Sequence, residues 1–127
     1  MPLPSLVGDR VVDLGYQSES AKRAAYAGAL AHVVPGTQES FSLTLMEAWL
    51  CGAPALVNAR CDVTREHVRA AAGGLAYDRA DELGGAVDWL LAHPEAARRM
   101  GRNGGEYVRR NFDWTVVVAR LRRALGV

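Results

Sequence analysis

Short apolar runs, each bounded by turn-forming residues, recur along this chain and predict four strands. They occupy residues 10–14, 31–35, 54–58 and 75–77, and the last of them is the weakest. The run at 31–35 is apolar on both sides of His32, which is typical of a strand that helices cover on both faces.

Between these runs the apolar residues follow a helical period and predict six helices. The first follows Ser18 as its cap, and its small residues at 21, 24, 25, 28 and 29 predict close packing against a sheet. The second starts near Ser40 to Ser42 and stops before Gly52. The last four run from Asp62 to Arg69, from Asp78 to Leu91, from Pro94 to about Arg110, and from Asp113 to Leu125. Asp62 and Asp113 are expected caps, and Pro94 suits a first turn. The last helix has an apolar stripe that includes Trp114.

Strands that alternate with helices imply a parallel sheet with right-handed crossovers. The fold class is therefore α/β, a partial Rossmann-like parallel sheet of about four strands with helices on both faces and extra helices at the C-terminus. No linker divides the 127 residues, so we expect one domain.

Composition and charge exclude several classes of function. The net charge of +1 gives no general attraction to nucleic acid or to a membrane surface, and no apolar run approaches the roughly 20 residues that span a bilayer. Cys51 and Cys61 form no metal motif, and no histidine has a ligand partner at metal-binding spacing. We expect a cytoplasmic protein with reduced thiols, no cofactor and no metal.

Two glutamates, Glu39 and Glu47, flank an otherwise nearly apolar segment with seven residues between them. A helix that starts after a strand points its free amide groups at the strand ends, where a diphosphate can bind. Glu39 then lies just before the helix and Glu47 about a turn and a half inside it. Carboxylates accept paired hydrogen bonds from vicinal diols, which suits a sugar or a ribose. On spacing alone, an ordinary loop carboxylate and a surface contact remain an alternative.

The segment reads Glu-Ser-Phe-Ser-Leu-x-Leu-Met-Glu-Ala-x-x-Cys-Gly-Ala-Pro over residues 39–54. It resembles the donor-binding signature of retaining GT-B glycosyltransferases of family 4, the glycosyl transferases group 1. Further matches follow in order along the whole chain: Val-Val-Asp-Leu-Gly-Tyr at 11–16, Lys-Arg-Ala-Ala-Tyr-Ala-Gly-Ala at 22–29, Glu-His-Val at 66–68, Gly-Gly-Leu-Ala-Tyr at 73–77 and Met-Gly-Arg-Asn-Gly at 100–104.

The resemblance implies a role for each matching position. Glu39, the expected catalytic residue, would contact the donor sugar and hold it against the diphosphate. Backbone amides around Phe41, Ser42 and Leu43 would cradle the distal phosphate and the sugar, and Glu47 would accept the ribose hydroxyls. Tyr16 would lie by the base. Position 42 is usually glycine in the family, so Ser42 is a departure that could crowd the phosphate.

By the same resemblance, residues 1–127 form the C-terminal domain that binds a nucleotide diphosphate sugar, incomplete at its N-terminal side. The acceptor domain is missing, as are the family's arginine and lysine that neutralise the diphosphate, so we expect weak binding by this chain. The expected function is the donor half of a retaining glycosyltransferase, with a nucleotide-sugar epimerase as a related option. The alternative is a non-catalytic stand-alone module or remnant that acts through protein–protein association.

By the same resemblance, the absent start of the donor-binding domain would supply neighbouring strands, so the sheet edge at residues 31–35 is left unpaired. We expect either that residues 11–14 pair directly with residues 31–35, or that two copies pair or exchange elements at this edge to form a homodimer.

Overall fold

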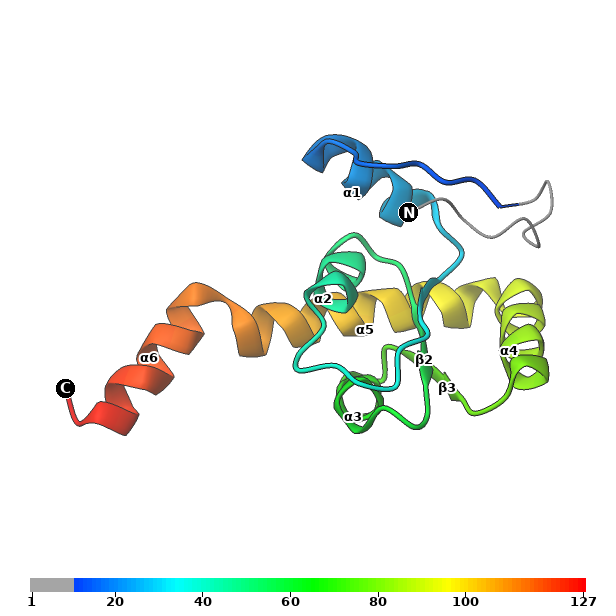
Figure 1. The fold of residues 1–127 in the computed structure, drawn as a ribbon. Helices are drawn as coiled ribbons and strands as arrows, with labels where there is room; N and C mark the ends of the chain where they lie inside the picture. The colour runs from blue at the N-terminus through cyan, green and yellow to red at the C-terminus, as the bar shows by residue number, and fades with distance from the viewer. Residues whose placement is uncertain (1–10) are drawn as a thin grey trace.

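The computed structural model describes residues 11–127. It confirms the α/β class, with a parallel sheet in the order β1-β2-β3 and helices around it (Figure 1). The strands are β1 (His32–Val34), β2 (Ala55–Asn58) and β3 (Gly74–Tyr77). The helices are α1 (Glu19–Gly28), α2 (Leu43–Leu50), α3 (Asp62–Ala71), α4 (Ala80–Ala92), α5 (Pro94–Phe112) and α6 (Trp114–Leu125).

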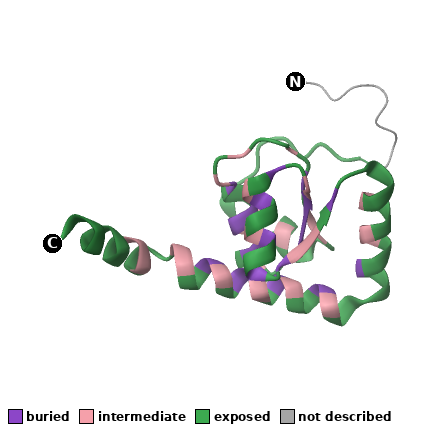
Figure 2. Ribbon diagram, turned by 90° about the horizontal axis from the view of Figure 1, so that it is seen from below, coloured by how far each residue is buried: buried purple, intermediate pink, exposed green. Residues whose placement is uncertain are grey.

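The central strand β2 divides the core into two apolar clusters, one on each face of the sheet. Ala55 and Val57 join side chains of α2, α3 and α5 on one face, whereas Leu56 joins Leu90 of α4 and Ala97 of α5 on the other. This alternation follows from the two-residue period of a strand, and it explains why three successive residues of β2, Ala55 to Val57, are apolar. Figure 2 shows the buried residues gathered on the strands and on the inward faces of α2 and α5. The predicted covering of both faces is confirmed.

The predicted strand at residues 10–14 is wrong within the described residues. Residues 11–14 have no regular secondary structure and pair with no strand, and the side chains of Val11, Val12 and Leu14 are exposed; Arg10 lies outside the described residues. The sheet consequently has three strands in residues 11–127 instead of about four, and the expected pairing of 11–14 with 31–35 is not formed. A strand needs a neighbour for its backbone hydrogen bonds, and apolar residues alone do not supply one.

The predicted caps are confirmed at two helices, whereas α3 has a different cap and α4 begins two residues later than predicted. The hydroxyl of Ser18 accepts from the backbone N–H of Ala21, and the carboxylate of Asp113 accepts from that of Thr115, as predicted. The caps of α3 and α4 are instead Cys61 and Arg79. Asp62 lies inside the first turn of α3, where it pairs with Arg65 over 2.7 Å.

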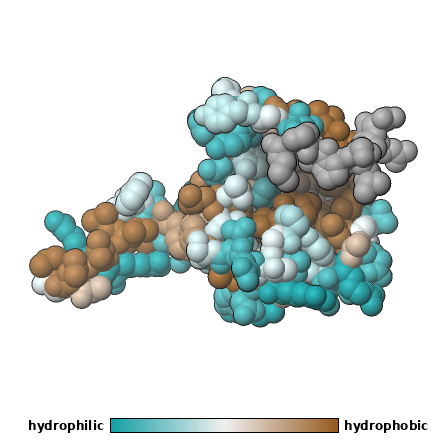
Figure 3. All heavy atoms as spheres, viewed as in Figure 1, coloured by the Kyte–Doolittle hydropathy of each residue, from teal (hydrophilic) through white to brown (hydrophobic). Residues whose placement is uncertain are grey.

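The two terminal helices lie outside the core. Helix α1 has no buried residue and contacts α2, so its small residues do not pack against the sheet as predicted. Helix α6 projects from the rest of the chain (Figure 1), and its apolar stripe is uncovered, with Trp114 80% exposed. The stripe is visible as an apolar surface along α6 (Figure 3). No helix in residues 11–127 is long and apolar enough to cross a membrane.

Candidate functional site

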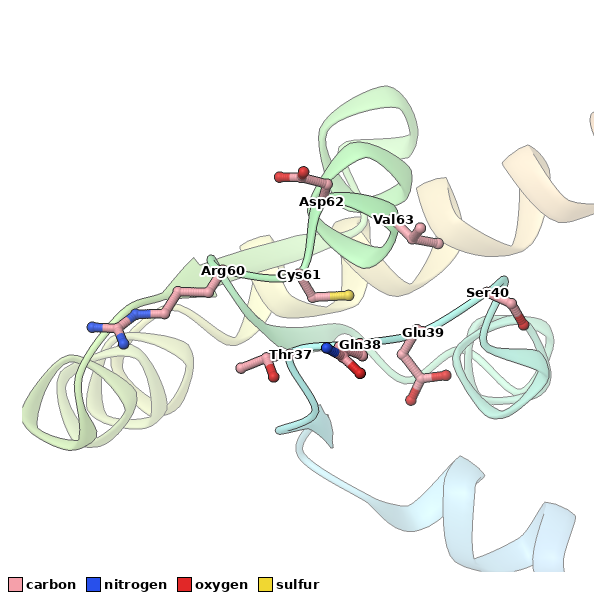
Figure 4. A pocket seen from close by; sticks show the side chains of 8 residues that line it. All are labelled: Thr37, Gln38, Glu39, Ser40, Arg60, Cys61, Asp62 and Val63. Carbon is pink, nitrogen blue, oxygen red and sulfur yellow. The ribbon is translucent and has the colours of Figure 1, made fainter.

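A pocket of about 480 Å³ opens at the carboxyl ends of β1 and β2. In open parallel sheets this edge is where ligands bind, because the loops that follow adjacent strands meet there. Figure 4 shows the side chains that line the pocket, which come from the loop after β1 and from the turn into α3. They are Thr37, Gln38, Glu39, Ser40, Arg60, Cys61, Asp62 and Val63.

Glu39 is the predicted site residue that lines this pocket. It is half-buried and lies between the end of β1 and the start of α2, as its position after the apolar run suggested. Its Oε1 atom lies 3.5 Å from the place that a Cβ atom would take on Gly36, so the carboxylate lies beside the backbone of its own loop. Glu39 therefore lines the pocket with its carboxylate pointing away from Cys61 and Val63 of the opposite wall (Figure 4).

Ser42 forms the entrance to α2 and adopts the left-handed conformation, with φ 72° and ψ 78°. The helix begins at Leu43, just after the range that the sequence predicted. Left-handed backbone is costly for residues with a Cβ, which gives a physical reason for glycine at this position in the family. The Ser42 side chain is buried, and its hydroxyl has no hydrogen-bond partner. The substitution therefore strains the helix entrance.

Replacing Ser42 with glycine should raise the free energy of unfolding by about 1 kcal/mol, because it relieves the left-handed strain and removes the unpartnered hydroxyl. Urea denaturation followed by circular dichroism measures this change. Ser40→Gly is the matched control, since φ at Ser40 is not positive, and it should give no increase. An equal gain from both variants would show that strain at residue 42 is not the cause.

The side chains on either side of Ser42 differ in burial: that of Phe41 is packed inside and that of Leu43 is exposed. The ring of Phe41 packs edge-on against His67 of α3 and Phe112 of α5, at centroid distances of 5.4 and 5.0 Å. His67 Nδ1 also lies 2.8 Å from the hydroxyl oxygen of Tyr107, and burial lowers the pKa of the His67 imidazole. The Leu43 side chain is 69% exposed. Phe41 thus anchors the loop in this aromatic cluster, whereas the side chain of Leu43 faces solvent.

Glu47 forms an ion pair that the sequence did not predict. Its Oε2 atom lies 3.2 Å from Nζ of Lys22 on α1, and the same Nζ lies 3.0 Å from Oε1 of Glu19. Hydrogen bonds to Glu19 and Glu47 raise the pKa of the Lys22 ammonium. No local spacing signals this contact, because Lys22 and Glu47 come from different helices.

Tyr16 lines a second pocket, of about 350 Å³, between residues 14–17 and α1. Its side chain is fully exposed, whereas Lys22 and Tyr26 of α1 form the opposite wall. The predicted site residues are thus divided between the two pockets. Glu39 lines the first and Tyr16 lines the second, whereas Glu47 pairs with Lys22, which lines the second. Their assigned roles stay predictions.

Two further residues of the first pocket were missed by sequence reasoning. Arg60 follows β2, and its Nε donates to Oδ1 of Asp78 over 2.6 Å, which raises the pKa of the guanidinium. Cys61 is buried, which by itself raises its pKa; hydrogen bonds, of which the one with Thr64 is the largest, outweigh the burial and leave the pKa lowered. The only available signal was their place directly after a buried strand. Within residues 11–127 no cluster of His, Cys, Asp or Glu could hold a metal ion.

A parallel sheet with a pocket at the carboxyl ends of β1 and β2 is an arrangement in which α/β proteins commonly bind ligands. The chain belongs to the glycosyl transferases group 1 family, whose model matches residues 5–107.

Named relatives agree with this assignment. A GDP-mannose-dependent alpha-(1-6)-phosphatidylinositol dimannoside mannosyltransferase of Mycobacterium tuberculosis is 33% identical over 82% of this chain and 27% of its own length. A D-inositol 3-phosphate glycosyltransferase of Salinispora tropica is 33% identical over 94% of this chain and 25% of its own length. The chain therefore spans about a quarter of the length of these curated relatives.

The fold is also that of a solved GT-B enzyme. Sucrose-phosphate synthase from Thermosynechococcus elongatus superposes with a TM-score of 0.79 and 32% identity, over 94% of this chain and 31% of the other. The shared part includes the three-stranded parallel sheet and the helices around it, which confirms the recognition of a group 1 glycosyltransferase made from the sequence.

Proposed function

We propose that this chain forms the donor-binding part of a retaining glycosyltransferase and binds a nucleoside diphosphate sugar. The observation that carries this proposal is the position of α2, whose N-terminus opens beside the pocket that Glu39 lines. The first amide groups of a helix have no intrahelical partners and carry partial positive charge, which suits the diphosphate. The family assignment and the order of the matching motifs support the same ligand.

The proposed chemistry is transfer of the sugar to an acceptor through an oxocarbenium-like transition state. The amide groups at the start of α2 stabilise the charge that develops on the departing diphosphate, which is the main contribution of such a site. Glu39 holds the sugar by its hydroxyls, and Glu47 accepts the ribose hydroxyls. The two cations that line these pockets are already paired, Lys22 with two glutamates and Arg60 with Asp78, so the affinity of this chain alone is low. We place this function in the cytoplasm, where free thiols such as Cys51 and Cys61 persist.

A titration with UDP, GDP and ADP tests the proposal. At a free concentration of one hundred times the dissociation constant, the nucleotide that fits should stabilise the chain by about 2.7 kcal/mol, seen as a rise in melting temperature. Glu47→Gln should weaken binding about tenfold or more, because it removes a charged hydrogen-bond acceptor for the ribose.

Glu66→Gln is the matched control for that titration. Glu66 is an exposed carboxylate on α3 that pairs with Arg69, so its replacement should leave nucleotide affinity unchanged. No shift of the melting temperature with any of the three nucleotides at millimolar concentration would contradict the proposal.

The uncovered apolar residues of α6 and of segment 11–16 favour a second candidate, a non-catalytic module that associates with another chain. A homodimer through the sheet edge is one form of it. Light scattering of the chain at several concentrations distinguishes the two functions when combined with the titration. A dimer that binds no nucleotide would support the module, and a nucleotide-dependent stabilisation would support the donor site.

A further inference from the structure

The strongest unassigned feature is the ammonium group of Lys22, which bridges two helices. It contacts Glu19 within α1 and Glu47 on α2, at 3.0 and 3.2 Å. The ion pairs within α3 and α5 join residues three or four apart on one helix, and therefore position nothing outside that helix. The Lys22–Glu47 pair instead fixes a side chain of α2 from a different element.

We propose that Lys22 is a positioning residue, which holds the Glu47 carboxylate in the orientation that accepts the ribose hydroxyls of the nucleotide. This inference rests on the proposed donor-binding function. It assigns to α1 a part in nucleotide binding, although α1 contributes no buried residue to the core.

The geometry leaves room for both partners of Glu47. Lys22 lies against one carboxylate oxygen, Oε2. An ionised carboxylate offers about four lone-pair sites on two oxygens, so a vicinal diol can be accepted while the ammonium stays in place. The ammonium also restricts the rotation of a carboxylate that is 41% exposed and would otherwise sample several rotamers. Holding it lowers the entropy cost of binding the diol.

Lys22 is itself placed by the fold. Tyr26, one turn further along α1, packs edge-on against His32 at the start of β1, with ring centroids 5.3 Å apart. This contact fixes α1 relative to the sheet, and Lys22 and Tyr26 form one wall of the pocket that Tyr16 lines. A nucleoside in that pocket would meet Lys22 directly and Glu47 beside it. The positioning role therefore agrees with the position of the predicted base contact.

The test compares each of UDP, GDP and ADP with its 2′,3′-dideoxy counterpart, using isothermal titration calorimetry on the full chain. The wild-type chain should prefer the ribonucleotide, because only it offers a diol to Glu47. In Lys22→Met this preference should fall about fivefold, the upper range for a partly exposed ion pair. Lys22→Arg, which keeps the cation, should retain the preference. A role in stability alone would change the affinities for both nucleotides equally and leave the preference intact.

Arg23→Met is the matched control, because Arg23 is an exposed cation on the same helix and does not contact Glu47. It should change neither affinity. Circular dichroism of each variant without nucleotide checks that the fold is unchanged.

The possible outcomes separate this inference from the function on which it rests. Wild-type binding with a preference for the diol, unaltered by Lys22→Met, overturns the positioning role and leaves donor binding in place. Tighter binding by Lys22→Met also overturns it, since Lys22 would then compete with the ribose. Absence of any nucleotide binding by the wild-type chain contradicts the proposed function, and the positioning role with it.

Discussion

Replacing Trp49 with alanine should lower the free energy of unfolding by about 3–5 kcal/mol, a large part of the stability of a small domain. Trp49 is 1% exposed and is among the largest fully buried side chains of residues 11–127. Its Nε1–H donates to the carbonyl oxygen of Gly73 over 2.9 Å, and its ring packs edge-on against Tyr107 at 5.8 Å. The alanine variant leaves a cavity between α2 and α5 and removes one of the two hydrogen bonds that the Gly73 carbonyl accepts, the other coming from the backbone N–H of Ala55.

Urea denaturation followed by circular dichroism measures this loss. Trp114→Ala is the matched control, because Trp114 is the same residue type but lies exposed on α6; its effect should stay within about 0.5 kcal/mol. Equal losses from the two variants would contradict the assignment of Trp49 to the core and of Trp114 to the surface.

Replacing Gly101 with alanine should lower the free energy of unfolding by about 1–3 kcal/mol. A Cβ atom at this position would lie 1.9 Å from the carbonyl oxygen of Gly52 and 2.6 Å from its carbonyl carbon. Both are backbone atoms of the turn that ends α2, so no side-chain rotation relieves the clash and α5 must move away. The loss should exceed the gain that alanine normally brings in the interior of a helix.

Gly85→Ala in α4 is the control with the opposite expected sign. Apart from the backbone of α4 itself and the two adjacent residues, no atom lies within 4 Å of a Cβ placed there, so the variant should raise stability by about 0.5–1 kcal/mol through helix propensity alone. Melting temperatures of the two variants, measured side by side, give the comparison. A stable Gly101→Ala protein would mean that α2 and α5 are not in close contact.

The features of this fold that depend on residues close together in the sequence could be predicted from the sequence. The caps Ser18 and Asp113 were identified from their own helix starts, and the apolar runs at β1 and β2 from their composition. The predicted strand at residues 10–14 was wrong because a strand depends on a partner elsewhere in the chain, which composition does not reveal. Asp62 was placed one residue too late for a cap because alternative caps differ little in sequence.

The candidate site divides in the same way. The place of Glu39 at the pocket followed from its position after a buried strand. The departure from glycine at Ser42 led to the prediction that the side chain could crowd the phosphate, which stays a prediction, whereas the left-handed backbone there was not predicted. The contacts of Lys22 with Glu47 and of Arg60 with Asp78 were missed, because each joins residues from different elements. Side-chain partners across elements depend on packing, and packing is known only once the chain is folded.

Helix α5 contributes to both apolar clusters, with Val108 in one and Ala97 in the other. Neither face of the sheet can therefore open without disturbing the helix that the other face needs. The amide hydrogens of β2, α2 and α5 should exchange with solvent together, in a single cooperative unit. Those of α1 and α6, which lie outside both clusters, should exchange at much lower opening free energies. Nucleotide binding at Glu47 would then slow amide hydrogen exchange more in α1 than in the core elements, because α1 has no burial of its own that already protects it.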